Sequence, residues 1–280
     1  MKLAGELREL AASAALARLE QGLAQRKEQE AAALLQDIQR RVKSGESPRI
    51  DALQADAALR LAALQRVQAS TSLAQLQSQW RALTSLQAVS SPEESLSAAT
   101  LTSLDKHPLL ASAAASVRAA QAKLKLAEAD TRDAPEVSVG VIRDRSLASD
   151  PALNSLRIGV RIPFGGVNRS APRIAAARAE LDTAEAEFDA VERRLAAESI
   201  TSRDAVESAR LAERLASERA AFSAEAQTLV AKAYRLGESD LPTRLRTDNE
   251  RFEADLALAR ARTETQRAVA RLHQSSGLLP

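Results

Sequence analysis

The sequence predicts a mainly α-helical protein in which long antiparallel helices form an α-barrel or a coiled-coil hairpin repeat, with one β-hairpin among them. Apolar residues make up 45% of the 280 residues but aromatic residues only 2%, so Ala and Leu supply most of the apolar content. Over most of the chain, apolar positions recur with a period of about 3.6 residues, as in amphipathic helices. From Pro172 to Leu236 there is neither Gly nor Pro. A helix of that length, roughly 100 Å, is typical of a coiled coil, a bundle or a tube.

The first part of the chain predicts a helical hairpin. A helical pattern runs from Met1 to Ser44, where the sequence SGESPRID interrupts it. Gly45 suits the left-handed conformation that ends a helix, and Pro48 suits the first position of the next one. The returning helix is expected to reach about Val89. The expected segments are this hairpin at 1–90, a polar linker at 91–108, a helix at 109–134, a β-hairpin at 135–164, and a long helix with a second helical hairpin at 165–280.

The period changes to about 2 residues in the predicted β-hairpin. Its alternating apolar positions are Val137, Val139, Val141, Leu156, Ile158, Val160 and Ile162. Each run is about 8–9 residues long, close to the length of a strand that spans a membrane. A polar loop, RDRSLASDPALN, with Pro151 and Asn154 is expected to join two antiparallel strands. Asp144, Arg145 and Ser146 are expected to belong to this loop.

The two helical hairpins are predicted to be copies of one repeat. At an offset of 192 residues, Gly45-Glu46-Ser47 coincides with Gly237-Glu238-Ser239, and Leu53 with Leu245. The shared turn at one register indicates a structural duplication. The second copy is preceded by a helix and a strand pair, whereas Met1 aligns with Arg193, inside the long helix. By this internal comparison the first copy is expected to be truncated at its N-terminus.

Composition excludes several classes of protein. The formal net charge is +2 with 27% charged residues, and such balanced charge is not typical of a nucleic-acid binder. There is no Cys, which excludes disulfides and thiolate chemistry.

The two histidines, His107 and His273, have no partner at metal-ligand spacing and are expected to cap a helix or lie at the surface. No catalytic or phosphate-binding motif is present, so neither an enzyme nor a cofactor or metal site is expected. The N-terminus carries charges at Glu6, Arg8 and Glu9 and is not read as a signal peptide.

The order of elements resembles the TolC-type outer-membrane efflux protein family. The segment HPLLASAAASVRAAQAKLKLAEADTRDAPEVSVGV is similar to the family's entry into a strand pair, and RIGVRIPFGGVNRSAPRIAAARAEL to its exit, where a strand ends in Pro163-Phe164 before glycines. The sequences GESPRIDALQADAAL and GESDLPTRLRTDNE resemble the family's helical turns at the periplasmic tip. The strand VSVGVIRDR suggests the heavy-metal efflux subgroup. The family has four strands per subunit, and this chain has two, so it is expected to be an incomplete member.

The resemblance implies a function, partners and site residues. The expected function is that of the outer-membrane channel component of a tripartite efflux or type I secretion system, a passive duct for metal ions or small molecules. The expected partners are two further copies in a homotrimer, a periplasmic adaptor, an inner-membrane pump and outer-membrane lipid, in a Gram-negative bacterium. The strands would join a membrane β-barrel with Arg157 and Arg161 facing its lumen. The tip turns, expected to contact the adaptor, comprise Lys43, Ser44, Gly45, Glu46, Ser47, Arg235, Leu236, Gly237, Glu238 and Ser239.

A soluble helical coiled-coil scaffold or interaction protein is the alternative. It accounts for the long helices, the balanced charge and the alanine content. It does not account for the strand hairpin or for the repeat.

Overall fold

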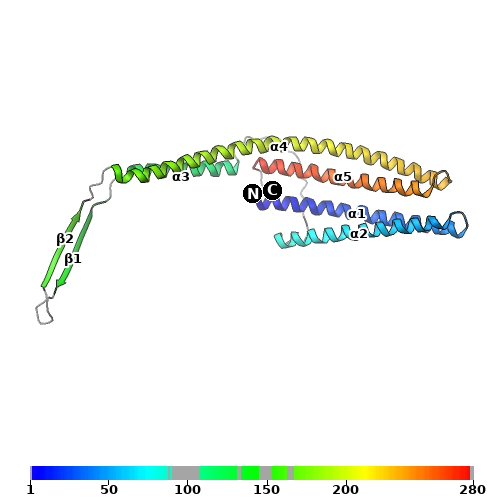
Figure 1. Ribbon diagram of the computed structural model, residues 1–280, viewed down its shortest axis with the longest axis horizontal. Coiled ribbons are helices and arrows are strands. Elements are labelled where there is room, and N and C mark those ends of the chain that lie inside the picture. The colour runs from blue at the N-terminus through cyan, green and yellow to red at the C-terminus, as the bar shows by residue number, and fades with distance from the viewer. Residues whose placement is uncertain are drawn as a thin grey trace. The chain divides into compact units, whose positions relative to one another are not determined.

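The computed structural model describes residues 2–87, 89, 107–130, 134–144, 153–162 and 167–277. The elements in chain order are α1 (Lys2–Lys43), α2 (Arg49–Thr84), α3 (Pro108–Ala129), β1 (Glu136–Asp144), β2 (Leu153–Arg161), α4 (Val167–Leu236) and α5 (Leu241–Ser275) (Figure 1). The fold class predicted from the sequence, long helices with one two-stranded antiparallel hairpin, is confirmed. The chain divides into two compact units, Met1–Ser103 with Ala196–Pro280, and Leu104–Leu195.

The first unit consists of two helical hairpins, α1 with α2 and the later part of α4 with α5. Within each hairpin the buried residues of a helix recur at coiled-coil intervals. In α2 the buried pairs Ala55/Ala62 and Leu73/Trp80 are each one heptad apart. In α4, Val206 and Ala220 are buried two heptads apart. Such spacing keeps one stripe of each helix facing its neighbour, and alanine lets the backbones approach closely.

The two hairpins meet through α1 and α5, which lie side by side (Figure 1). Ion pairs between side chains of described residues cross this contact, which we call the α1–α5 seam. Arg260 Nε is 3.1 Å from Glu20 Oε1, Arg267 Nε is 2.9 Å from Glu9 Oε1, and Arg271 Nη2 is 3.8 Å from Glu9 Oε2. Helices from the two copies of the repeat are thus joined by charge as well as by packing.

The two turns have the same backbone geometry, as the predicted duplication requires. Gly45 has φ +80° and Gly237 has φ +79°. The residue after each glycine donates its N–H to a carbonyl five positions back, Glu46 to Arg41 and Glu238 to Ala233, at 2.8 and 2.9 Å. This is the Schellman arrangement, in which a left-handed residue closes the helix and satisfies its last carbonyls. The starts of α2 and α5, at positions 49 and 241, also differ by the repeat offset of 192.

Replacing Gly237 with Ala is expected to lower the free energy of unfolding by about 1–2 kcal/mol, because a Cβ is disfavoured in the left-handed region. No atom lies within 4 Å of a Cβ placed there, so the effect is conformational and not steric. Gly22 lies inside α1 with equally open surroundings, and Gly22→Ala is expected to stabilise by about 0.5–1 kcal/mol. Urea unfolding followed by circular dichroism measures both, and shifts of the same sign would contradict the assignment.

The start of α5 is fixed by a side-chain cap that α2 lacks. Asp240 Oδ1 accepts a hydrogen bond from the Thr243 backbone N–H at 2.9 Å. At the corresponding position α2 has Pro48, which makes no side-chain cap bond. The Thr243 side chain, followed by its backbone N–H, holds the pKa of Asp240 below the 3.8 of an unperturbed aspartate.

Stability is therefore expected to depend on the charge of Asp240 in acid. A lowered folded-state pKa means that the unfolded state binds the proton more readily, so the contribution is present above about pH 4 and is lost as the pH falls through the folded pKa. Asp240→Asn retains a capping oxygen without titrating. The difference in urea midpoint between wild type and this variant is expected to shrink from about pH 7 to about pH 2. A difference that is unchanged over this range would contradict the role given to the carboxylate.

Three boundaries differ from those expected from the sequence. α2 ends at Thr84, before Val89, because Ser85 adopts the left-handed conformation with φ 58° and donates its N–H to the Arg81 carbonyl. α3 ends at Ala129, before 134, where Asp130 leaves helical geometry ahead of Pro135. Asp144 belongs to β1 and Asn154 to β2, and neither lies in the loop, because both take part in the strand pairing. The linker positions 91–106, Arg145, Ser146 and the segment 163–166 lie outside the described residues.

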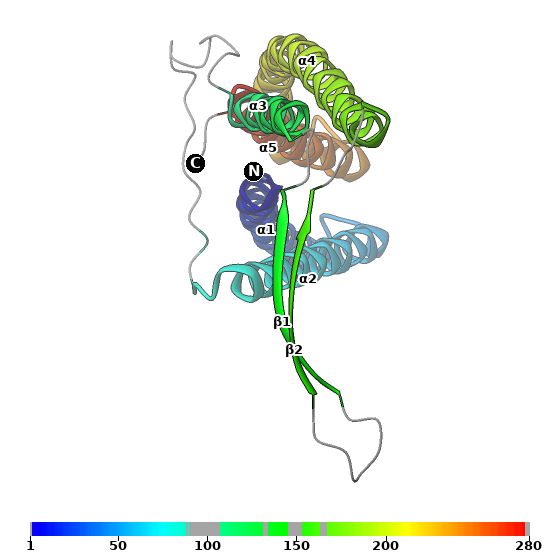
Figure 2. The ribbon, with the colours of Figure 1, turned by 90° about the vertical axis from the view of Figure 1, so that its left-hand side faces the viewer.

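The second unit contains α3, the hairpin and the first part of α4. His107 caps α3, its Nδ1 accepting from the Leu109 N–H at 3.2 Å. Ion pairs connect α3 with α4, between Lys123 and Glu180 at 2.8 Å and between Asp130 and Arg173 at 2.5 Å. β1 and β2 form a two-stranded antiparallel ribbon (Figure 2).

Candidate functional site

The β-hairpin has one apolar face and one polar face. In its register Val137 is opposite Val160, Val139 opposite Ile158, and Val141 opposite Leu156. Residues directly opposite in an antiparallel pair share a face, so these six branched side chains lie together. They are between 63% and 73% exposed, and Ile162 follows them at the end of β2. The apolar positions predicted from the alternation are therefore placed on one surface that nothing in the described unit covers.

The opposite face is mainly polar and also carries Ile142, whereas Arg143 and Asn154 lie at the loop end of the apolar face. Glu136 pairs with Arg161, Ser138 with Gly159, and Gly140 with Arg157. Arg161 Nη1 is 3.9 Å from Glu136 Oε2. Both arginines that the sequence suggested for a lumen lie on this face. Small residues opposite Arg157 leave space over the sheet, because a Cβ placed at Gly140 has no atom within 4 Å.

Both strands are edges. A two-stranded sheet pairs each strand on one side only, so a row of backbone N–H and C=O groups is unpaired along the outer side of each strand. Such a ribbon is marginally stable by itself in water. The hairpin therefore leaves one apolar face uncovered and two edges open to further hydrogen bonds.

The two predicted tip turns lie at the same end of the first unit, where a hydrophobic cluster joins all four helices. Its buried members are Leu35, Ile38, Ala55, Tyr234 and Leu241. Burial raises the pKa of Tyr234, and the Arg41 guanidinium, 5.3 Å from the ring centroid, opposes that shift. The glycine turns themselves are exposed, and the cluster beneath them joins the two hairpins.

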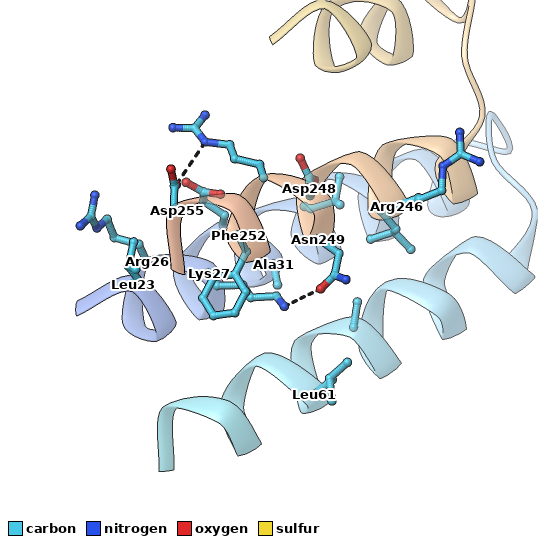
Figure 3. Close-up of a pocket in the computed structure, with 15 residues that line it drawn as sticks. Leu23, Arg26, Lys27, Ala31, Leu61, Arg246, Asp248, Asn249, Phe252 and Asp255 are labelled. Carbon is cyan, nitrogen blue, oxygen red and sulfur yellow. Dashed lines mark hydrogen bonds and ion pairs between the residues drawn. The ribbon is translucent and has the colours of Figure 1, made fainter. Parts of the chain in front are cut away.

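A groove of about 340 Å³ lies beside the α1–α5 seam, with α2 as its third wall (Figure 3). Lys27 points across it, donating to Asn249 Oδ1 at 2.8 Å and lying 4.1 Å from the centroid of the Phe252 ring. Burial lowers the pKa of Lys27, and the Glu253 charge partly restores it. The groove has no nucleophile paired with a base, and this arrangement acts as a helix contact. The sequence analysis did not identify this groove. The available signal was Phe252, because the chain has only four Phe residues.

The structure confirms the predicted role of one histidine and corrects the predicted position of the other. His107 caps a helix, as predicted. His273 is 8% exposed in the last turn of α5, so the expectation of a surface position is wrong; Leu272 and Ser275 beside it are buried as well. Among the described ranges, no group of three or more His, Asp or Glu side chains is placed to bind a metal ion.

No helix in the described part of the chain has both the length and the hydropathy needed to cross a bilayer.

Solved structures share this fold. A membrane protein from Pseudomonas aeruginosa superposes with a TM-score of 0.76 at 18% identity, over 99% of this chain and 66% of that one. The outer-membrane channel OprN gives 0.74 at 20% identity, over 99% and 66%. The CmeC outer membrane channel of Campylobacter jejuni gives 0.73 at 14% identity, over 98% and 62%. This chain therefore spans about two thirds of the length of these structures. No curated protein sequence matches the chain.

The family description "Outer membrane efflux protein" matches residues 102–278. That match includes α3, both strands, α4 and α5, and it covers more than half of the chain. The resemblance drawn from the order of elements and from the turn sequences is thereby confirmed. The chain belongs to the outer membrane efflux protein family.

Proposed function

We propose that this chain forms part of the wall of an outer-membrane export duct, in which the hairpin contributes to a membrane β-barrel and the helices to a periplasmic tube. The observation that carries the proposal is the two-faced hairpin. In lipid, every backbone group must be paired and the outward side chains must be apolar. Six branched side chains on one face and polar residues on the other satisfy the second condition, and pairing with strands of neighbouring copies satisfies the first.

The duct is passive and has neither catalytic groups nor a cofactor. A homotrimer would surround one lumen, with Arg157 and Arg161 on its inner side. An inner-membrane pump would supply the energy, and a periplasmic adaptor would dock at the exposed turns, Lys43 to Ser47 and Arg235 to Ser239. The transported substances would be metal ions or small molecules. The shared Schellman geometry of the turns supports this docking site, since it offers an adaptor two equivalent surfaces per chain.

Vesicle flotation combined with conductance recordings tests the proposal. The full chain is mixed with lipid vesicles and centrifuged through a density gradient, and the floating fraction is fused with a planar bilayer. The expected result is flotation in a form that resists carbonate extraction, with stepwise ion currents. A chain that remains monomeric in the aqueous fraction and gives no current would overturn the proposal and support the soluble scaffold.

A further inference from the structure

The groove beside the α1–α5 seam has the size and the position of a small-molecule site. Its volume of about 340 Å³ lies within the range of ligand pockets, roughly 300–1,000 Å³. Its walls are α1, α2 and α5, which all belong to the same unit of the chain. Because α1 and α2 form one hairpin and α5 belongs to the other, an occupant of the groove contacts both hairpins.

Apolar side chains line the groove on all three helices. They include Leu23 on α1, Leu61 on α2 and Phe252 on α5. Leu61 faces Lys27 and Phe252 across the groove (Figure 3) and is 52% exposed. An apolar group placed between Leu61 and Phe252 would remove apolar surface from water on both sides, which favours its binding.

The charged side chains of the groove do not balance. Its lining has four cationic and three carboxylate side chains. Most of them are held in ion pairs along α5, namely Arg244–Asp248, Arg246–Glu250 and Arg251–Asp255, at 2.8, 3.8 and 3.7 Å. The lining charges that remain are on α1, where Arg26 and Lys27 stand against Glu30. The groove therefore has a surplus of one positive charge.

The Lys27 ammonium is the cation that an anion in the groove would meet. Its direct partners among the described residues are neutral, since it donates to Asn249 Oδ1 at 2.8 Å and lies 4.1 Å from the centroid of the Phe252 ring. That hydrogen bond leaves further N–H donors of the ammonium without an acceptor in the described part of the chain. Burial lowers the pKa of Lys27, and Glu253 restores it only in part. An anion would supply the missing compensation through a charge-assisted hydrogen bond.

The groups that position Lys27 are specific to one copy of the repeat. At the offset of 192 residues, Asn249 corresponds to Ala57 and Phe252 to Arg60. The returning helix of the first hairpin therefore has neither the amide nor the ring. Both hairpins fold with the same turn geometry, so the fold of a hairpin does not require these two side chains.

We propose that this groove binds a small amphipathic organic anion, a carboxylate carried on an aromatic or aliphatic body, with the carboxylate on Lys27 and the body between Phe252 and Leu61. Arg26 is exposed and lines the same groove, so it adds a second donor group for the carboxylate. A surplus of one positive charge suits one negative charge on the ligand. The site uses neither the β-hairpin nor the glycine turns, so it does not depend on the proposed duct.

Isothermal titration calorimetry of the full chain with 2-naphthoate tests the site, with 2-naphthamide as a neutral probe of the same shape and protein-free detergent as the blank. We expect 2-naphthoate to bind once per chain. We expect 2-naphthamide to bind about 10- to 100-fold more weakly, because it replaces a hydrogen bond between charged groups by one to a neutral group. Equal affinities for the two probes, or no binding of 2-naphthoate, would overturn the proposal.

Substitutions at Lys27 separate its charge from its role as a helix contact. Lys27→Met keeps an unbranched side chain but removes the ammonium, and it is expected to bind the two naphthyl probes with similar affinity. Lys27→Arg keeps the positive charge and is expected to retain the preference for 2-naphthoate. A purely structural role would change the affinity for both probes together. A preference for 2-naphthoate that survives in Lys27→Met would place the anion elsewhere.

Two leucines of α2 locate the body of the ligand. Leu61 and Leu64 are both 52% exposed, but of the two only Leu61 lines the groove. Leu61→Ala is expected to weaken the binding of 2-naphthoate about three- to tenfold, because the ligand loses apolar contact area. Leu64→Ala is the matched control and is expected to leave the affinity unchanged. Equal effects of the two substitutions would contradict the placement of the ligand in this groove.

Discussion

Val139→Arg is expected to abolish stable insertion of the chain into lipid. Val139 lies in the middle of the apolar face, opposite Ile158, and is 68% exposed. On the lipid side of a membrane barrel, an arginine near the bilayer midplane costs about 2–4 kcal/mol per chain, and the cost is paid by every copy in the assembly. Flotation with vesicles measures the effect as loss of protein from the lipid fraction.

Ser138→Arg is the matched control for this substitution. It introduces the same side chain one residue away, on the polar face, where Gly159 is opposite. Flotation is expected to remain close to that of the wild type. Equal losses from both variants would show that the two faces of the hairpin do not meet different environments, and would remove the main support for a barrel strand.

Ile38→Ala is expected to lower the free energy of unfolding of the helical unit by about 2–5 kcal/mol. Ile38 is fully buried, and its cluster contains residues of all four helices, among them Tyr234 and Leu241. Alanine leaves a cavity where the ends of both hairpins meet, and the turns on either side restrict how far the helices move to fill it. Urea unfolding followed by far-ultraviolet circular dichroism measures the loss.

Leu19→Ala serves as its control, because Leu19 lies on the same helix but is 51% exposed. A change within about 0.5 kcal/mol is expected, as for surface positions in general. A loss at Ile38 no larger than the loss at Leu19 would mean that the tip cluster is not the part of the unit that holds the hairpins together.

The parts of the fold that depend on local pattern could be predicted from the sequence. Alternation of Val137, Val139 and Val141 with small or polar residues predicted the strand and its two faces, since a pleated strand has a period of two. The Gly-Glu-Ser turns were predicted because few residues besides glycine adopt a positive φ. Those same turns gave the register of the repeat, and the matching starts of α2 and α5 follow from it.

The parts that depend on long-range packing could not be predicted. The α1–α5 seam brings together Lys27 and Phe252, which are far apart in the sequence and have no local pattern in common. The burial of His273 likewise has no signal in the neighbouring sequence. The early end of α2 depends on the left-handed conformation of Ser85. Serine rarely adopts this conformation, so the sequence does not predict it.

If the hairpin pairs with strands of other copies, as proposed, its open edges have a consequence for the order of assembly. Helical hairpins close through contacts between residues near in sequence and form rapidly, whereas strand pairing between chains is a bimolecular step. Each copy would finish its helices alone and complete its strands only on meeting others. The β region would then form at a rate that rises with protein concentration, whereas the helical region would fold at a rate independent of protein concentration. A premature ribbon, with both edges free, would be the species most prone to aggregate.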